Sequence, residues 1–347
     1  MSGGKPRPPR ETPFDLSQVG TRPLAGRPHL VDVGMFGRLT EPGASVADFL
    51  ASLPDVLAAK DLRALAKHVA DAHRGGHGVA VAMGGPVVKT GCPPYVLDLV
   101  RRGIVTSLHL AGSTAIHDWE IAAAGETSED VAKGLGEGIY GMADETGRAF
   151  AAAAARGARE GTGLGRALGV AMLEAKLPHC GQSLLAEAAL RGIPCTVHVA
   201  VGTDTVHMHP TADGRDLGEA TLLDFRLACS VVSKLAHGAW LNIGSAVLLP
   251  EVFLKAVTVA RNTGHPVEDL TTANFDMLPH YRPATNVVKR PPARGFNLTG
   301  HHEIMVPLFR LAVLAELAAT PTKAADETPR RGPRKPVAPA TQRKRLR

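Results

Sequence analysis

The chain has 347 residues, of which 44% are hydrophobic and 21% charged, with a formal net charge of +6 at pH 7. This composition excludes wholesale disorder and suffices for one large folded core. Residues 321–347 carry nine basic and two acidic side chains, and the first ten residues add three basic ones. The body between them is therefore mildly acidic, so the positive sum does not indicate a basic surface.

The two ends differ in composition from the middle of the chain. Residues 1–28 are rich in Gly, Pro and Arg and lack apolar periodicity, so we expect a flexible arm that lies over a partner subunit. Residues 321–347 contain five prolines and no aromatic residue, which predicts a disordered basic tail. Its charge can attract nucleic acid without reading bases, although a contribution to solubility is the simpler interpretation. Residues 29–320 are expected to form a single domain.

The cysteine pattern and the lack of long apolar runs indicate the cellular compartment of the protein. The four cysteines include no CxxC pair, which argues against a disulfide scaffold and favours a reducing environment. The start of the chain lacks the basic and apolar pattern of a secretory signal. No apolar run approaches the roughly 18 residues of a membrane span. We therefore expect a soluble cytoplasmic protein without a membrane partner.

Short apolar segments alternate with helical patterns along the body. Apolar spacing predicts two helices over residues 45–73, interrupted by Pro54, and a long Ala-rich helical region that ends near Leu177. Short apolar runs predict strands over 79–83, 105–110, 195–201, 239–243 and 270–275, with further helices over 95–102, 219–235 and 251–262. This alternation predicts an α/β fold with a mainly parallel, Rossmann-like sheet and helices on both faces.

The predicted strands end in small or turn-forming residues. Four of them finish in GGP, AGS, GTD and NIGS, and ligands of parallel sheets bind at the carboxyl ends of strands. Glycine lets the backbone approach a phosphate, and a helix start supplies free N–H groups. Such turns need glycine in any protein, but their repetition favours a nucleotide site. The GxGxxG fingerprint of dinucleotide sites does not follow any predicted strand.

Histidines and carboxylates supply the candidate chemistry. On an extended strand His207 and His209 would face the same side, a spacing that suits two metal ligands, with Glu303 or Asp204 as a third. We do not, however, expect a resident metal. The alternative is that these histidines form hydrogen bonds in a polar site. His280 or His301 is a better candidate for a general acid or base.

Asp204 and Asp276 follow predicted strands. A carboxylate in that position can hold a ribose hydroxyl or a substrate ammonium. Both residues can equally serve as caps of the helices that follow. For Asp276 we favour the functional interpretation, whereas for Asp204 the two interpretations stay open.

The order of these motifs resembles the deoxyhypusine synthase family over about residues 80–318. The most specific part is Thr272-Ala273-Asn274-Phe275-Asp276 followed by Arg282-Pro283, at nearly the spacing of the family's Thr-Ala, Phe-Asp and Arg-Pro series. The other motifs that carry the resemblance are Thr90-Gly91 after the first strand, Ala111-Gly112 after the second, Ile193-Pro194 before Gly202-Thr203-Asp204, Asp224-Phe225-Arg226, residues 241–246 and residues 303–308.

The resemblance implies an NAD-binding parallel sheet in a homotetramer. It implies NAD-dependent oxidation of a polyamine such as spermidine to an imine, followed by transfer of the aminobutyl group through a lysine. The implied cofactor-binding residues are Thr90, Gly91, Ala111, Gly112, Ser113, Asp204, Gly244, Ser245, Thr272, Ala273 and Asp276.

The resemblance implies Lys289 as the catalytic lysine, and His280 and His301 join it as candidate acid or base residues from their own positions in the sequence. The family's lysine lies in a Trp-Gly-Lys sequence, and Lys289 stands about two residues before that position. The two apolar residues that precede Lys289 favour a desolvated amine, as covalent catalysis requires, whereas the neighbouring Arg290 favours a solvated loop.

The sequence departs from the family at the substrate-binding positions. The family's base histidine falls near Pro250 and its substrate carboxylate near Val199. We therefore expect a deoxyhypusine synthase-like enzyme acting on a primary amine or polyamine, but not orthodox deoxyhypusine synthesis. The alternatives are histidine- or metal-assisted chemistry on the same fold, or a non-catalytic module that binds a ligand or nucleic acid.

Overall fold

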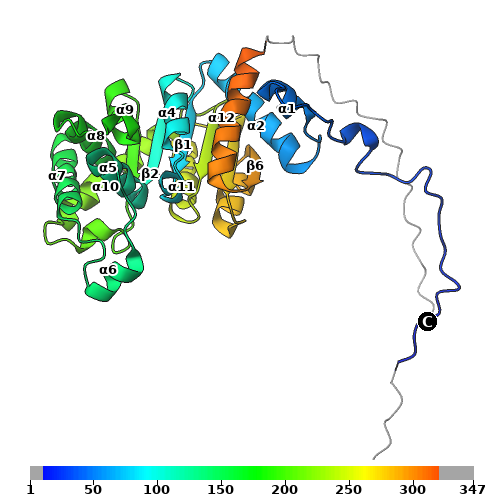
Figure 1. Ribbon diagram of the computed structural model, residues 1–347, viewed down its shortest axis with the longest axis horizontal. Helices are drawn as coiled ribbons and strands as arrows, with labels where there is room; N and C mark the ends of the chain where they lie inside the picture. The colour runs from blue at the N-terminus through cyan, green and yellow to red at the C-terminus, as the bar shows by residue number, and fades with distance from the viewer. Residues whose placement is uncertain (1–10, 320–347) are drawn as a thin grey trace, which may run out of the picture.

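A computed structural model describes residues 11–319 of the chain. Its centre is one six-stranded parallel sheet with the strand order β3-β2-β1-β4-β5-β6, covered by helices on both faces (Figure 1).

The strands are β1 (Val79–Met83), β2 (Ser107–Ala111), β3 (Cys195–His198), β4 (Ala239–Ile243), β5 (Leu270–Asp276) and β6 (Ala293–Thr299). The helices are α1 (Val46–Ser52), α2 (Leu57–Arg74), α3 (Pro86–Lys89), α4 (Pro93–Arg101), α5 (Gly112–Ala124), α6 (Val131–Glu137), α7 (Asp144–Glu160), α8 (Leu164–Glu174), α9 (Leu184–Arg191), α10 (Gly214–Val232), α11 (Leu248–Asn262) and α12 (His302–Ala318). Short 3-10 helices are η1 (Val33–Met35), η2 (Cys180–Gln182) and η3 (Thr205–Met208), and η4 (Pro283–Lys289) is a π-helix. The predicted α/β class with a parallel, Rossmann-like sheet is confirmed.

The central strands are apolar because both faces of the sheet are covered. Every residue of β1 is buried, and its side chains alternate between two cores. Val81 and Met83 join the core under α2, α4 and α12, whereas Ala80 and Ala82 join the core under α10 and α11. On this second face Trp240 stacks on Phe253 with ring centroids 4.6 Å apart.

Several predicted elements are confirmed, and others need correction. The strands over 79–83 and 239–243 and the two helices around Pro54 are confirmed. The long helical region consists of α5, α6, α7 and α8, because glycines with positive φ end the first three helices: Gly125 (76°), Gly138 (73°) and Gly161 (67°). The sequence did not predict β6, an edge strand in which Arg294 and Gly295 are exposed.

The strand predicted over 195–201 was too long. β3 ends at His198, and the chain then turns into η3, which contains His207 and precedes His209. The two histidines therefore do not share one side of an extended strand, and the geometry that suggested a pair of metal ligands is absent from this segment.

The predicted flexible arm over residues 1–28 and disordered tail over residues 321–347 remain predictions. Residues 11–44 are almost entirely exposed and run away from the helical body beyond α1 (Figure 1). The predicted tail, 321–347, lies outside the described residues. Among residues 11–319, no helix combines the length and apolar character needed to cross a bilayer.

Candidate functional site at the carboxyl ends of the strands

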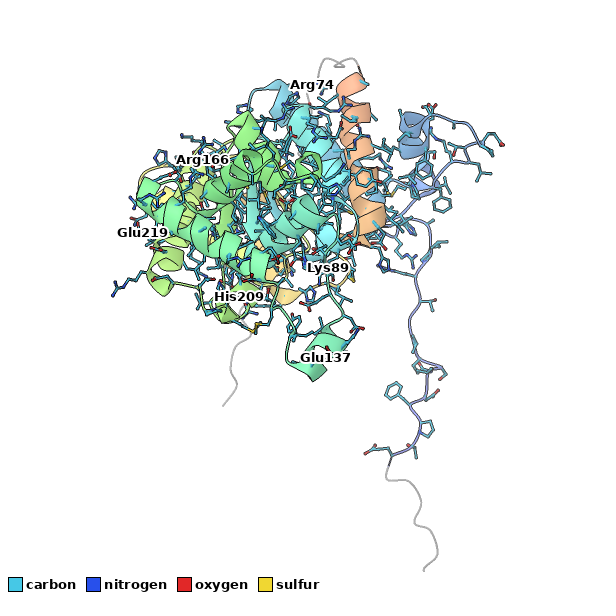
Figure 2. The ribbon with its side chains drawn as sticks, turned by 60° about the vertical axis from the view of Figure 1, so that its left-hand side comes forward. Arg74, Lys89, Glu137, Arg166, His209 and Glu219 are labelled. Carbon is cyan, nitrogen blue, oxygen red and sulfur yellow. The ribbon has the colours of Figure 1, made fainter. Side chains whose placement is uncertain are left out.

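The strand order reverses between β1 and β4. From β1 the chain continues to β2 and β3 on one side, whereas β4 leads to β5 and β6 on the other. In open parallel sheets, ligands bind outside the carboxyl ends of the strands at such a switch point. Figure 2 shows this side of the molecule around Lys89 and His209, with Glu137 of α6 beyond them; Arg74, which precedes β1, lies at the opposite side.

Two glycines occupy the switch point. The Gly84 N–H donates to the carbonyl of Ile243 (2.9 Å), and a Cβ on Gly84 would lie 1.9 Å from the carbonyl oxygen of Gly244. Gly244 itself has φ +65°, and a Cβ there would lie 2.8 Å from Val87 and 3.0 Å from His302 Nε2. Only glycine fits at either position, so the two backbones approach each other without intervening side chains.

A second glycine turn joins β2 to α5. A Cβ on Gly112 would lie 2.2 Å from Oδ2 of Asp204, so the Asp204 carboxylate lies against the first turn of the helix. Burial raises the pKa of Asp204, although hydrogen bonds from the N–H groups of Ala200 and Ser113 favour the charged form. The structure thus gives Asp204 the position of a helix cap, with a carboxylate that remains half-buried.

A third group of residues at this edge, one aspartate and three histidines, lies where β5 ends and α12 begins. Asp276 is buried, accepts the N–H of Met277 (2.8 Å) and lies 4.0 Å from Nε2 of His280. His302 is only 1% exposed, its Nδ1 has no partner among the described residues, and burial lowers its pKa although the Asp276 charge opposes this. His301 is exposed and lies 3.8 Å from Glu303.

Lys289 is not part of this edge. It is the last residue of η4, which leads from the carboxyl end of β5 back to the amino end of β6, and its side chain is exposed. The structure therefore separates Lys289 from His280 and His301, with which we expected it to share one site.

Thr272 and Ala273 are also separated from the strand ends. They lie within β5, in register with Trp240 and Leu241, and both are completely buried. Ser245 does follow a strand, but its hydroxyl accepts the N–H of Leu249 at the start of α11. Of the residues predicted to bind cofactor, Thr272 and Ala273 thus cannot contact a ligand outside the strand ends without a local rearrangement.

Thr90 and Gly91, both predicted to bind cofactor, lie between α3 and α4. Thr90 lies at the end of α3, where its hydroxyl donates to the carbonyl of Pro86 (3.1 Å). Gly91 has φ +73° and begins the turn into α4. Both residues still lie in the connection that follows β1.

The weak metal candidates are not brought together. His209 Nε2 bonds to the carbonyl of Gly141 (2.9 Å), and its ring packs against Gly147 of α7. His207 lines a separate cavity of about 20 Å³ with Phe150. No three His, Cys, Asp or Glu side chains between residues 11 and 319 are placed to hold a metal ion.

Sequence analysis missed several polar groups near this edge. An amide ladder crosses three strands, from Asn242 to Asn274 (2.9 Å) and from Asn274 to Asn297 (2.9 Å). His117, three residues before Glu120 on the first helix after β2, also escaped notice. Their spacing of three residues on a helix that begins at a strand end was the available signal.

No protein-family model and no curated protein sequence matches the chain. Solved structures similar to it include an apo structure of ArgZ, an arginine dihydrolase from Cyanobacteria, with TM-score 0.45 and 15% identity over 73% of this chain and 31% of that one. Another is a conserved putative LOR/SDH protein from Methanococcus maripaludis S2, with TM-score 0.47 and 14% identity over 80% and 74% of the two chains. A third is AgrE in complex with ornithine and NAD+, with TM-score 0.46 and 15% identity over 73% and 33%. The chain spans about a third of the length of ArgZ and AgrE, and at these scores the likeness is limited to general architecture.

Proposed function

We propose that this chain is an NAD-dependent enzyme that oxidises a primary amine or polyamine to an imine. The observation that carries the proposal is the switch between β1 and β4, where the Gly84 and Gly244 backbones meet. The strand order 3-2-1-4-5-6 is that of dinucleotide-binding sheets. When bound, NAD would supply the hydride acceptor.

The residues at this edge suit a dinucleotide. Gly84 and Gly244 leave room for a pyrophosphate to approach the backbone. The first turn of α12 has no side-chain cap, so the N–H groups of His302 and Glu303 have no acceptor among the described residues and can bind an anion. Asp204 and Asp276 follow strands on either side of the switch, where carboxylates can accept bonds from ribose hydroxyls.

The charge near this edge suits a cationic substrate. Residues 126–145, which include α6, carry six acidic side chains and one lysine. This acidic segment ends beside the site, because the carbonyl of Gly141 bonds to His209 and Gly141 also packs against Thr205, the residue after Asp204. Its field would attract an alkylammonium ion and raise the local concentration of a polyamine.

The resemblance to deoxyhypusine synthase would extend this chemistry to alkylamine transfer through a lysine. An exposed Lys289 near the amino end of β6 does not support a covalent carrier at the opposite edge. We therefore propose imine formation without transfer through Lys289. The homotetramer and the cytoplasmic location remain predictions.

Calorimetric titration of the purified full chain with NAD+ and NADH tests the proposal. We expect saturable binding that a Gly244→Ala variant loses, because the added Cβ meets Val87 and His302. Absence of binding of either cofactor to the natural chain would refute it. Deleting residues 321–347 should leave binding intact, whereas loss of ligand binding on deletion would favour a nucleic-acid-associated module.

A further inference from the structure

His117 belongs to a hydrogen-bonded chain of three side chains close to the proposed cofactor site. His117 Nδ1 and the Thr127 hydroxyl are 2.7 Å apart, and Thr127 also bonds to Oε2 of Glu120. The second carboxylate oxygen, Oε1, accepts from Thr146 (3.4 Å). α5 supplies His117 and Glu120, and the start of the acidic segment supplies Thr127.

The hydrogen bonds determine which nitrogen of the His117 imidazole carries the proton. Burial would raise the pKa of Glu120, but the nearby His117 ring, whose Nδ1 lies 3.8 Å from Oε2, and the hydrogen bond from Thr127 outweigh it and hold the pKa below its ordinary value, so the carboxylate is ionised and only accepts. The single hydroxyl hydrogen of Thr127 therefore goes to Glu120. Nδ1 of His117 must donate to the Thr127 oxygen, which leaves the lone pair of the neutral ring on Nε2.

The ring lies beside the turn that follows β1. A Cβ on Gly85 would be 3.4 Å from Cδ2 of His117, the carbon bonded to Nε2, and 3.0 Å from the hydroxyl of Ser113. The His117 side chain is 14% exposed, and Nε2 has no partner among residues 11–319 yet is not closed off from solvent. The basic nitrogen is thus open at the glycine turn next to the switch point.

Resting on the proposed function, we infer that His117 is the general base of amine oxidation, held in its tautomer by Thr127 and Glu120. Nε2 takes a proton from the substrate ammonium nitrogen. With NAD bound as the hydride acceptor, the nitrogen lone pair would form the C=N bond while the α C–H bond breaks and its hydrogen leaves as hydride. The products are the iminium ion, the reduced cofactor and protonated His117, so charge and electrons balance.

Turnover of spermidine and of 1,4-diaminobutane with NAD+, followed by NADH absorbance, tests this role. A His117→Gln variant is expected to bind NAD+ like the natural chain and to lose about 10²- to 10⁴-fold in kcat, the usual contribution of a general base. In a His117→Ala variant, added imidazole should restore part of the rate, which a purely structural role of the ring would not produce. The matched control is His265→Gln, an exposed histidine between α11 and β5 that should behave like the natural chain.

Two positioning variants test the tautomer. Glu120→Gln replaces the acceptor by an amide that can donate to Thr127, so the hydroxyl can then donate to Nδ1 and the lone pair on Nε2 is lost. We expect kcat to fall with KM unchanged. Thr127→Val should act in the same direction, and Thr127→Ser should recover activity. Nitrogen NMR of labelled protein should find the Nδ1–H tautomer of His117 fixed in the natural chain and in Thr127→Ser, but not in Glu120→Gln or Thr127→Val.

The outcomes separate this inference from the function on which it rests. If the chain does not bind NAD+, the proposed function fails, while NMR still decides the tautomer. If NAD+ binds and amines are oxidised but His117→Gln keeps full kcat, the general base lies elsewhere and the inference fails. If NAD+ binds and neither amine is oxidised, both the amine substrate and the role of His117 are refuted.

Discussion

Gly84 and Gly244 are in such close contact that a Cβ on Gly84 would lie 1.9 Å from the carbonyl oxygen of Gly244. The two residues follow β1 and β4, the neighbouring strands at which the sheet order reverses. No side chain can be accommodated between the two turns, because the contact is backbone to backbone. This contact explains the glycines that follow β1 and β4, the turns at which we propose that the cofactor binds.

A Gly84→Ala substitution should destabilise the protein by about 3 kcal/mol or more, because the added methyl group meets the backbone carbonyl of Gly244 and the clash cannot be relieved by a rotamer change. Urea denaturation measures the loss, and NAD+ titration of the folded fraction should show weakened binding.

Gly218→Ala is the matched control for this prediction. Gly218 lies in α10 and is exposed, and a Cβ on it would have no neighbour within 4 Å, so alanine there should stabilise by about 0.5–1 kcal/mol through helix propensity. Equal stability of the two variants would show that the Gly84–Gly244 contact is looser in solution than described.

Asp118 should make stability depend on pH. It is buried on α5 and accepts bonds from the Ser183 hydroxyl (2.6 Å) and the N–H groups of Leu184 (2.8 Å) and Leu185 (3.1 Å). Burial raises its pKa from 3.8 to about 6 despite these bonds. The folded state therefore holds the proton more tightly than the unfolded chain, so this contribution to stability is complete below about pH 4 and is lost as the pH rises through about 6.

The Asp118→Asn variant tests this pH dependence. An amide cannot ionise, so the variant should lack a component of about 3 kcal/mol in the difference between its unfolding free energies at about pH 4 and about pH 7. Denaturant titrations of both proteins at each pH give the double difference. Superimposable pH profiles would mean that Asp118 has an ordinary pKa in the folded chain.

The acidic segment should increase affinity for cationic substrate without affecting NAD. The triple variant Glu126→Gln, Glu137→Gln and Glu145→Gln removes three exposed charges, none of which forms an ion pair among residues 11–319. We expect a higher KM for spermidine, a weaker dependence of kcat/KM on salt and unchanged NAD+ binding, because the effect is long-range attraction.

A charge-matched control replaces three exposed glutamates elsewhere: Glu41→Gln, Glu219→Gln and Glu268→Gln. Glu219 on α10 lies on a different side of the molecule from Glu137 (Figure 2). The control should keep the KM of the natural chain. Equal effects of the two triple variants would assign the attraction to net charge and not to the acidic segment.

Lys289→Ala should leave NADH formation with spermidine within about twofold of the natural rate, since an exposed surface substitution away from the site perturbs little. Borohydride reduction during turnover, followed by mass spectrometry, should find no amine adduct at Lys289. An adduct there, or a large loss of rate, would restore lysine-mediated transfer and show that η4 moves in catalysis.

The strands that the sequence predicted best are the ones buried on both faces. β1 and β4 lie in the middle of the sheet, where both faces are buried and apolar residues predominate, and their limits matched the apolar runs. β6 escaped prediction because it is an edge strand with Arg294 exposed. An edge strand needs no apolar run, so local pattern carries little signal there.

In the candidate site, too, some features could be predicted from local sequence and others could not. Glycines at strand ends could be found by sequence alone, because a turn that must bring backbones together leaves a local mark. The grouping of Lys289 with His280 and His301 depended on which edge each segment reaches, and the π-helix between them places the lysine apart. His117 gave no local signal beyond its spacing from Glu120, because its position depends on a contact with Gly85, distant in the sequence.

The sequence by itself determined the alternation of strands and helices, the parallel α/β class and the positions of the glycine turns, because each of these follows from side-chain period and backbone freedom within a few residues. Only the tertiary structure decided the order of the strands, the meeting of Gly84 with Gly244 and the hydrogen-bonded chain of His117, Thr127 and Glu120 at the same edge. These features depend on how distant segments pack around a shared core, which local composition does not encode.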